Sequence, residues 1–304
     1  MSGARSHRSE AARDFLATRR AKITPEDAGL TAYGGNRRVT GLRREEVAML
    51  AGVSADYYTR LEKGHLAGVS DSVLDAVAGA LHLDEAERAY LFDLARNANA
   101  GGRPGRRGTT RRRATQVRPT VQTVLDSMRD VPAFVRNGRL DILGTNTLGR
   151  ALYSPVFDSP TRTSDVSPPN LARFGFLDPA ARDCFPDHDG ACHTNVQLLR
   201  AEAGRTPHDK DLTDLIGELS TRSEDFRTRW AAHDVRLHRT GRKSFHHPAV
   251  GRLDLSFEAM ALEADPGLTL TVYTAEPDTA TAERLSLLAS WAATHAADEA
   301  PLPG

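Results

Sequence analysis

The sequence predicts two domains of different class. The first is an all-α domain of about five helices that contains a helix-turn-helix, and the second is an α+β domain with an antiparallel sheet. Two short helical patterns meet at a tight turn within residues 43–63, a Gly- and Arg-rich stretch covers residues 101–116, and short alternating apolar runs follow it. We therefore expect domains over residues 1–100 and 117–304, joined by a linker over 101–116.

The first helix is expected over residues 9–21, where apolar side chains such as Phe15 and Leu16 recur at helical spacing. The next begins near Arg43. In it Val47, Leu50 and Ala51 follow the i, i+3, i+4 spacing of one buried helix face, and Gly52 then breaks the helix.

A second short helix follows this turn. Ser54 is a favoured N-cap residue, because its hydroxyl can accept a hydrogen bond from a free backbone N–H. Tyr57, Tyr58 and Leu61 are expected to face inward, and Gly64 is expected to end the helix. Two further helices are expected over residues 73–81 and from residue 84 onward, which completes the all-α domain.

The outward residues of the second short helix suit contact with DNA, since this helix lies in the major groove in a helix-turn-helix. Arg60 can pair with guanine, Asp56 can accept from cytosine, and Thr59 can do either. The alternative is a helical hairpin whose charges are merely solvated. The residues assigned to DNA contact are Arg37, Arg38, Arg43, Arg44, Ser54, Ala55, Asp56, Thr59, Arg60 and Lys63. For Arg37 and Arg38 a solvated loop is an equal alternative.

Charge is distributed unequally between the two halves of a chain whose formal net charge is zero. Residues 1–116 carry 20 Lys and Arg against 14 Asp and Glu, so the remainder has a net charge of −6. This asymmetry favours a polyanion as partner of the first half. The six arginines within 101–116 lie among glycines, which predicts a flexible linker that also attracts phosphates.

The second half mixes helical and strand patterns. Asn137-Gly138 between two apolar runs predicts a β-hairpin, and a Pro-, Ser- and Thr-rich loop is expected over 154–169. Helices are expected over 194–202, 211–219 and 223–233, and a closing helix over 281–296. Strands are expected from Phe245, over 253–264 and over 268–273. A phase switch within 253–264 predicts either a bulge or burial on both faces.

These segments resemble one family in particular. RRVTGLRREEVAMLAGVSADYYTRLEKG is similar to the helix-turn-helix of Cro/phage-repressor-like (XRE-like) MmyB regulators, and VPAFVRNGRLDILGTN with HPAVGRLDLSFEAMAL resembles their PAS-like ligand-binding domain. The resemblance implies a one-component transcriptional regulator, with fatty-acid-like ligands suggested for the pocket. Asp187-His188-Asp189 departs from it, because the resemblance leads us to expect Asp followed by Trp.

Apolar side chains of the second half are pocket candidates, although each can equally be plain core. They are Phe134, Ile142, Leu152, Trp230, Phe257 and Tyr273. A short Cys/His cluster leaves a metal or redox sensor open as an alternative, but its spacing is not that of a usual zinc site. That cluster consists of Cys184, His188, Cys192 and His193.

No catalytic motif or membrane-spanning run is visible, and residues 1–15 do not show the apolar core expected of a signal peptide. We therefore expect a cytoplasmic regulator without enzymatic activity or cofactor. Its expected partners are operator DNA, a second copy of the chain, and a small apolar or amphipathic ligand. In a further alternative, the second domain serves only dimerisation or partner docking.

Overall fold

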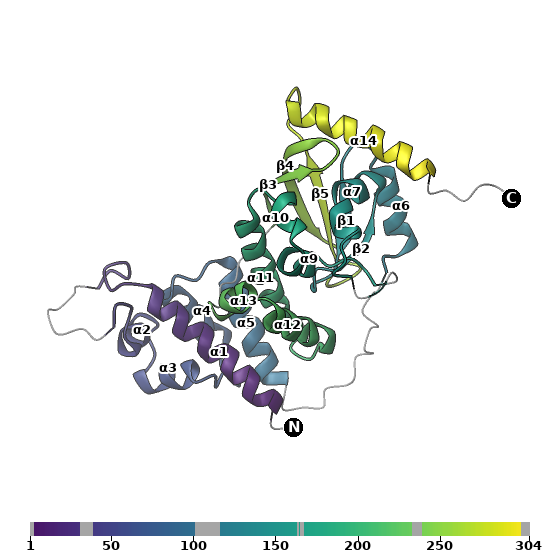
Figure 1. Ribbon diagram of the computed structural model, residues 1–304. Helices are drawn as coiled ribbons and strands as arrows, with labels where there is room; N and C mark the ends of the chain where they lie inside the picture. The colour runs from purple at the N-terminus through teal and green to yellow at the C-terminus, as the bar shows by residue number, and fades with distance from the viewer. Residues whose placement is uncertain are drawn as a thin grey trace. The chain divides into compact units, whose positions relative to one another are not determined.

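A computed structural model of the chain describes residues 3–30, 39–100, 116–162, 164, 167–232 and 239–298 (Figure 1). The chain divides into two compact units. The first comprises residues 1–109 together with 200–210 and 230–237, and the second comprises 110–199, 211–229 and 238–304. The predicted linker over 101–116 falls almost wholly outside the described residues.

The predicted five helices of the first domain are confirmed. They are α1 (Gly3–Lys22), α2 (Arg44–Leu50), α3 (Ala55–Glu62), α4 (Asp71–Ala80) and α5 (Glu85–Ala100). Phe15 and Leu16 of α1 are fully buried and share one apolar core with side chains of all four other helices. Phe15 also meets the ring of Tyr90 edge to face, with centroids 5.0 Å apart. This single core fixes the helix-turn-helix to the rest of the unit.

The turn between α2 and α3 follows the chemistry of its residues. Gly52 adopts a φ of +65°, which favours glycine, and the hydroxyl of Ser54 accepts a hydrogen bond from the backbone N–H of Tyr57. Val47 is buried as predicted. The prediction for Leu50 was wrong, because the buried face of α2 contains Val47, Ala48 and Ala51, and Leu50 lies 38 % exposed beside it.

The first unit also contains a later part of the chain. The side-chain amide of Asn97 on α5 donates to the carbonyl of Gly204, 2.5 Å away. A Cβ at Gly204 would lie 2.2 Å from the ring of Tyr90, so only glycine allows this close approach. Within the same unit, the guanidinium of Arg200 lies 4.1 Å from the ring centroid of Trp230.

The second unit is built on a five-stranded antiparallel sheet in the order β2-β1-β5-β4-β3. The strands are β1 (Ala133–Arg136), β2 (Ile142–Thr145), β3 (Thr240–His247), β4 (Gly251–Ala261) and β5 (Thr269–Thr274). The predicted α+β class with an antiparallel sheet is therefore confirmed. The Asn137-Gly138 hairpin joins β1 to β2, and β3 begins five residues before Phe245, the predicted start.

The described chain forms further helices from residue 119 onward, and some were not predicted. They are α6 (Pro119–Ser127), α7 (Thr147–Leu152), α8 (Ser154–Phe157), α9 (Leu171–Leu177), α10 (Ala180–Cys184), α11 (His188–Arg205), α12 (Lys210–Arg222), α13 (Glu224–Ala231) and α14 (Ala280–Asp298). The predicted loop over 154–169 contains α8. Three residues of the Cys/His cluster lie on one helix, because α11 begins at His188 and runs through Cys192 and His193.

Both faces of the sheet are covered. Leu125 of α6 packs with Ala133, Val135 and Leu270 on one face. The opposite face carries aromatic side chains, and we call it the inner face. Of the two alternatives for the phase switch within 253–264, the bulge was wrong, since the pairing of β4 with β3 and with β5 continues without a shift, and Met260 on the second face is 45 % exposed. The change of phase instead reflects Leu262, just beyond β4, which packs on the α6 side.

Candidate nucleic-acid interface and aromatic cluster

The outward surface of α3 presents several polar side chains to solvent. Asp56 and Arg60 are exposed, one helical turn apart, and Thr59 between them is partly buried. Neither Asp56 nor Arg60 has a side-chain partner within the described part of the chain, so both are available to an outside ligand. Ser54, Ala55 and Lys63 are exposed at the two ends of the same helix. The structure therefore brings together the residues predicted to read DNA.

A buried ion cluster connects α3 to α1 and α2. Glu62, 2 % exposed, accepts from Arg20 of α1 at 2.8 and 2.9 Å and from Arg44 of α2 at 2.9 and 3.0 Å. Arg20 also donates to the carbonyl of Leu42 at 2.8 Å. Burial raises the pKa of Glu62, but hydrogen bonds from Arg20 and Arg44 outweigh it and hold the pKa below its ordinary value. The cluster thus links three helices through one carboxylate.

This cluster separates the predicted roles of Arg43 and Arg44. The guanidinium of Arg44 is held by Glu62, although about half of its side chain remains exposed. Arg43 is exposed, and its backbone N–H donates to the carboxylate of Glu46 at 2.6 Å, which caps α2. The geometry therefore favours Arg43 over Arg44 as a phosphate contact. Arg37 and Arg38 lie outside the described residues.

Six aromatic rings contact one another on the inner face of the sheet. Their centroids are 5.1 Å apart for Phe134–Tyr153, 5.4 Å for Tyr153–Phe245 and 5.5 Å for Phe245–Tyr273. Phe185 reaches Phe245 at 5.8 Å, and Phe257 reaches Tyr273 at 6.1 Å. We call these rings the aromatic cluster: Phe134, Tyr153, Phe185, Phe245, Phe257 and Tyr273.

The cluster contains a buried polar pair as well. The hydroxyls of Tyr153 and Tyr273 lie 2.6 Å apart, so one donates to the other. Burial raises the pKa of Tyr273 to about 12, and burial also holds the pKa of Tyr153 well above its ordinary value. Both phenols therefore stay protonated at neutral pH. The amine of Lys243 reaches the hydroxyl of Tyr153 at 3.4 Å.

Three of the predicted pocket residues, Phe134, Phe257 and Tyr273, belong to the aromatic cluster, and Ile142 and Leu152 are buried in the same unit. Trp230 does not join them, because it belongs to the first unit with Arg200. Tyr153, Phe185 and Lys243 were missed. For Lys243 a signal exists, since Gly241, Lys243, Phe245 and His247 alternate at the period of a strand.

The residues of the predicted Cys/His cluster make structural contacts, among them one between the Cys192 sulfur and His188 Nε2 at 3.4 Å. Cys184 and Cys192 are both buried, and burial raises the pKa of the two thiols to about 11 and about 12. His188 interacts with the carbonyl of Gly175 at 2.9 Å, and His193 pairs with Gln197 at 2.8 Å. Among the described residues, no group of three or more His, Cys, Asp or Glu side chains is arranged to hold a metal ion.

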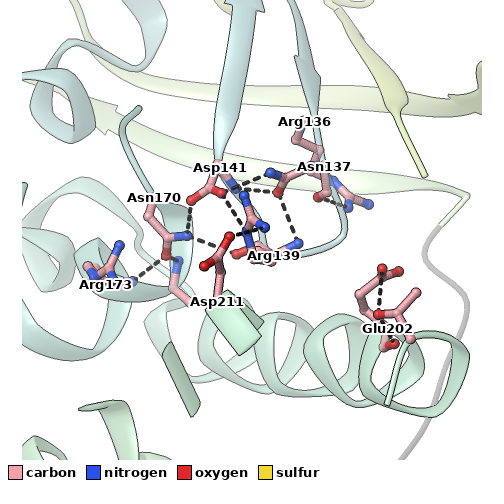
Figure 2. Close-up of polar contacts among 10 residues, drawn as sticks. Arg136, Asn137, Arg139, Asp141, Asn170, Arg173, Glu202 and Asp211 are labelled. Carbon is pink, nitrogen blue, oxygen red and sulfur yellow. Dashed lines mark hydrogen bonds and ion pairs between the residues drawn. The ribbon is translucent and has the colours of Figure 1, made fainter. Parts of the chain in front are cut away.

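A buried polar network closes the β1–β2 hairpin, as Figure 2 shows. Asn137 donates to Asp141 at 2.8 Å, and Asn170 donates to the other oxygen of Asp141 at 2.7 Å. Arg139 bridges Asp141 and Asp211, each at 3.1 Å. Because these groups satisfy one another, the network stabilises the loop of five residues between β1 and β2. Its role is structural.

The comparisons with known proteins agree with this geometry. A family model described as MmyB-like transcription regulator ligand binding domain matches residues 117–288, more than half of the chain. A helix-turn-helix domain model matches residues 5–91. A search of the curated proteins found no match. Within the described residues, no helix is long and apolar enough to cross a membrane.

Proposed function

The chain belongs to the MmyB-like transcription regulators, and we propose that it binds an operator through α3 and adjusts that binding to a small apolar or amphipathic molecule held by its second domain. Helix-turn-helix and ligand-binding domains together form the architecture of a ligand-responsive, DNA-binding transcription regulator. The observation that carries the proposal is the exposed outer surface of α3. Among the described residues, the side chains of Asp56 and Arg60 on this surface have no partner, while the inner surface of α3 packs in a buried core.

On DNA, α3 lies in the major groove with its N-terminal turn toward the bases. Arg60 donates two hydrogen bonds to guanine, and Asp56 accepts from a cytosine amine. Arg43, Ser54 and Lys63 contact the phosphates on either side, which sets the register without reading sequence. One such helix buries little surface, so we infer that two copies bind half-sites of an inverted repeat about one helical turn apart.

The ligand response is assigned to the aromatic cluster. A ligand changes DNA affinity only if it binds two arrangements of the chain with different affinities. Apolar rings with a few polar groups among them are the usual lining of small-molecule sites, and here two phenols and one amine provide those polar groups. We infer that a medium-sized apolar molecule contacts these rings and shifts the equilibrium between two arrangements.

The test is to identify the operator by footprinting with the full chain, and then to titrate apolar and amphipathic compounds against that complex. We expect a compound that raises the melting temperature of the protein to change its operator affinity as well. A stabilising compound that leaves operator affinity unchanged contradicts the ligand response. In that case the second domain serves dimerisation or partner docking.

A further inference from the structure

Lys243 places a charged side chain on the inner face of the sheet. It lies on β3, which forms an edge of the described sheet, and it pairs with Leu255 of β4. Side chains that are directly opposite in an antiparallel pair share one face, and Leu255 is fully buried. Phe245, two residues further along β3, is also buried on this face. Lys243 therefore points toward the aromatic cluster, although part of its side chain remains exposed.

Three aromatic rings and one hydroxyl surround the amine. Nζ of Lys243 lies 4.2 Å from the ring centroid of Phe185, 5.2 Å from that of Phe245 and 5.4 Å from that of Tyr153. It lies 3.4 Å from the hydroxyl oxygen of Tyr153. Within the described part of the chain no carboxylate forms an ion pair with it. Three rings and one phenol therefore surround the charge at close range.

The ionisation of this group is unusual for a lysine. Burial lowers the pKa of Lys243 to about 8. The amine is therefore unprotonated in about one molecule in ten at pH 7, and in about half at pH 8. The facing phenols and thiols have raised pKa values and stay neutral, and Arg136 acts on the two phenols from β1. These facing groups are Tyr153, Tyr273, Cys184 and Cys192.

The residue type matters at this position. The chain has only four lysines, Lys22, Lys63, Lys210 and Lys243, against 36 arginines. Arginine is thus the usual cation of this chain, and it remains charged under all ordinary conditions. Lysine is the cation that can lose its proton and act as a nucleophile, most readily in an apolar site. A group that only repelled other strands from the edge could equally be arginine.

We propose that the amine of Lys243 binds an apolar aldehyde covalently, as an imine. This inference rests on the proposed function, since it names the ligand class of the same domain. The nitrogen lone pair attacks the carbonyl carbon, and a proton moves from nitrogen to oxygen to give a carbinolamine. Tyr153 donates a proton to the hydroxyl, water leaves, and the resulting iminium returns a proton to Tyr153. One aldehyde and one amine thus give one imine and one water, without oxidation or reduction.

The surroundings suit both the ligand and the intermediate. An uncharged aldehyde enters the apolar site without the desolvation cost that a carboxylate has. The positive iminium occupies the place of the ammonium, where the three rings stabilise a cation. The phenol of Tyr153 is protonated at neutral pH, as a proton donor to the departing hydroxyl must be.

The experiment uses the full chain, incubated with octanal or with cinnamaldehyde and then reduced with cyanoborohydride. Reduction turns an imine into a stable secondary amine, and peptide mass spectrometry locates it. We expect labelling of Lys243 to exceed that of Lys22, Lys63 and Lys210 several-fold in the folded protein, and the preference to disappear in urea. Lys243→Arg should lose the selective label, while Lys22→Arg, at an exposed position of α1, should keep it.

Equal labelling of the four lysines in the folded protein would overturn the proposal, and so would no labelling of Lys243. Octanoate tests the alternative that Lys243 binds a carboxylate. If octanoate raises the melting temperature only when Lys243 is present, and octanal forms no adduct, the site binds carboxylates and the imine proposal is overturned. If Lys243→Arg does not fold, Lys243→Met replaces it as the variant that should lose the label. If neither variant folds, the relative labelling of the four lysines in the wild-type chain tests the proposal. Operator binding is measured on the same sample. Operator binding without an adduct contradicts only the imine, whereas an adduct without operator binding contradicts only the proposed regulator.

Discussion

The surface of α3 and the aromatic cluster are built in opposite ways. The residues of the α3 surface lie within ten consecutive positions, 54–63, and all but Thr59 are exposed. The aromatic cluster draws on β1, β3, β4, β5 and the ends of α7 and α10, and most of its rings are buried. A site on one helix takes its geometry from helical spacing alone. A site between elements exists only once the whole domain has packed, so its function and its stability depend on the same side chains.

The two regions also differ in the interaction that holds them. The helix-turn-helix depends on one buried carboxylate shared by two arginines, whereas the cluster depends on ring packing and a pair of phenols. Ion clusters respond to pH and are strongly destabilised when one partner is removed. The variants below remove these interactions one at a time, in each region.

The largest effect is expected for Glu62→Ala. It leaves Arg20 without its carboxylate in a partly buried position, and removing one partner of a buried ion pair costs about 3–5 kcal/mol. The free energy of unfolding from urea denaturation measures this loss, which we expect in the helical domain. Glu45→Ala, at an exposed position of α2, is the control and should change little. Equal losses from the two variants would contradict the role of the cluster.

The same carboxylate predicts a dependence on pH. The pKa of Glu62 is lower in the folded than in the unfolded state, so its contribution to stability is fully present above the ordinary value of 4.5. That contribution is lost as the pH falls through the lowered pKa. The difference in unfolding free energy between wild type and Glu62→Gln should therefore shrink below pH 4.5. A difference that stays constant down to the acid unfolding of the protein would refute this assignment.

In the aromatic cluster, Tyr153→Phe is the matched test. It removes one hydroxyl of the phenol pair and leaves that of Tyr273 buried without its partner, which costs about 1–3 kcal/mol. Tyr57→Phe in α3 is the control, because Tyr57 is only partly buried. The thermal unfolding of the second domain should move down, while operator affinity at low temperature should not change. A lower operator affinity would show that the two regions are coupled through this pair.

The same contrast explains what the sequence could and could not predict. The position of α3, its cap at Ser54 and its exposed Asp56 and Arg60 all follow from local spacing, and the structure has them in place. The prediction that Leu50 is buried failed because two faces of a short helix such as α2 fit the same apolar pattern. The buried face is decided by the packing of Ala48 in the core of the first unit, and that packing involves residues distant in the sequence.

The second domain was less predictable for a physical reason. Tyr153 and Phe185 directly follow α7 and α10, two short helices without a long apolar repeat, and nothing local shows that their rings meet over β3. Trp230 has the composition of a pocket residue, but its place is decided by Arg200, thirty positions earlier. Lys243 was missed because β3 begins at Thr240, before the predicted start at Phe245. A charged residue weakens the apolar alternation from which a strand is predicted.

Base reading by the helix surface gives a smaller effect, on binding rather than on folding. Arg60→Ala should weaken binding to the cognate operator by about 1–3 kcal/mol and relax preference at one base pair. Arg96→Ala, exposed on α5, is the control and should bind as the wild type does. Electrophoretic mobility shifts with operators varied at single positions measure both quantities. If Arg60→Ala lowers the affinity for all sequences equally, Arg60 contacts phosphate and not a base.

The smallest effect is expected for Arg43→Ala, and it tests where the phosphate attraction of this chain resides. Removing one phosphate contact should reduce the slope of log affinity against log salt by about one unit, without changing sequence preference.

Residues 1–100 carry equal numbers of acidic and basic side chains, 14 of each, so the six arginines of 101–116 provide the entire excess of positive charge in the first half. Replacing these six with serine should therefore flatten the slope more than Arg43→Ala does, while Arg60 still selects its base. A slope that depends on Arg43 but not on the six arginines would place the attraction in the folded domain, where the exposed cations of α2 and α3 would account for it.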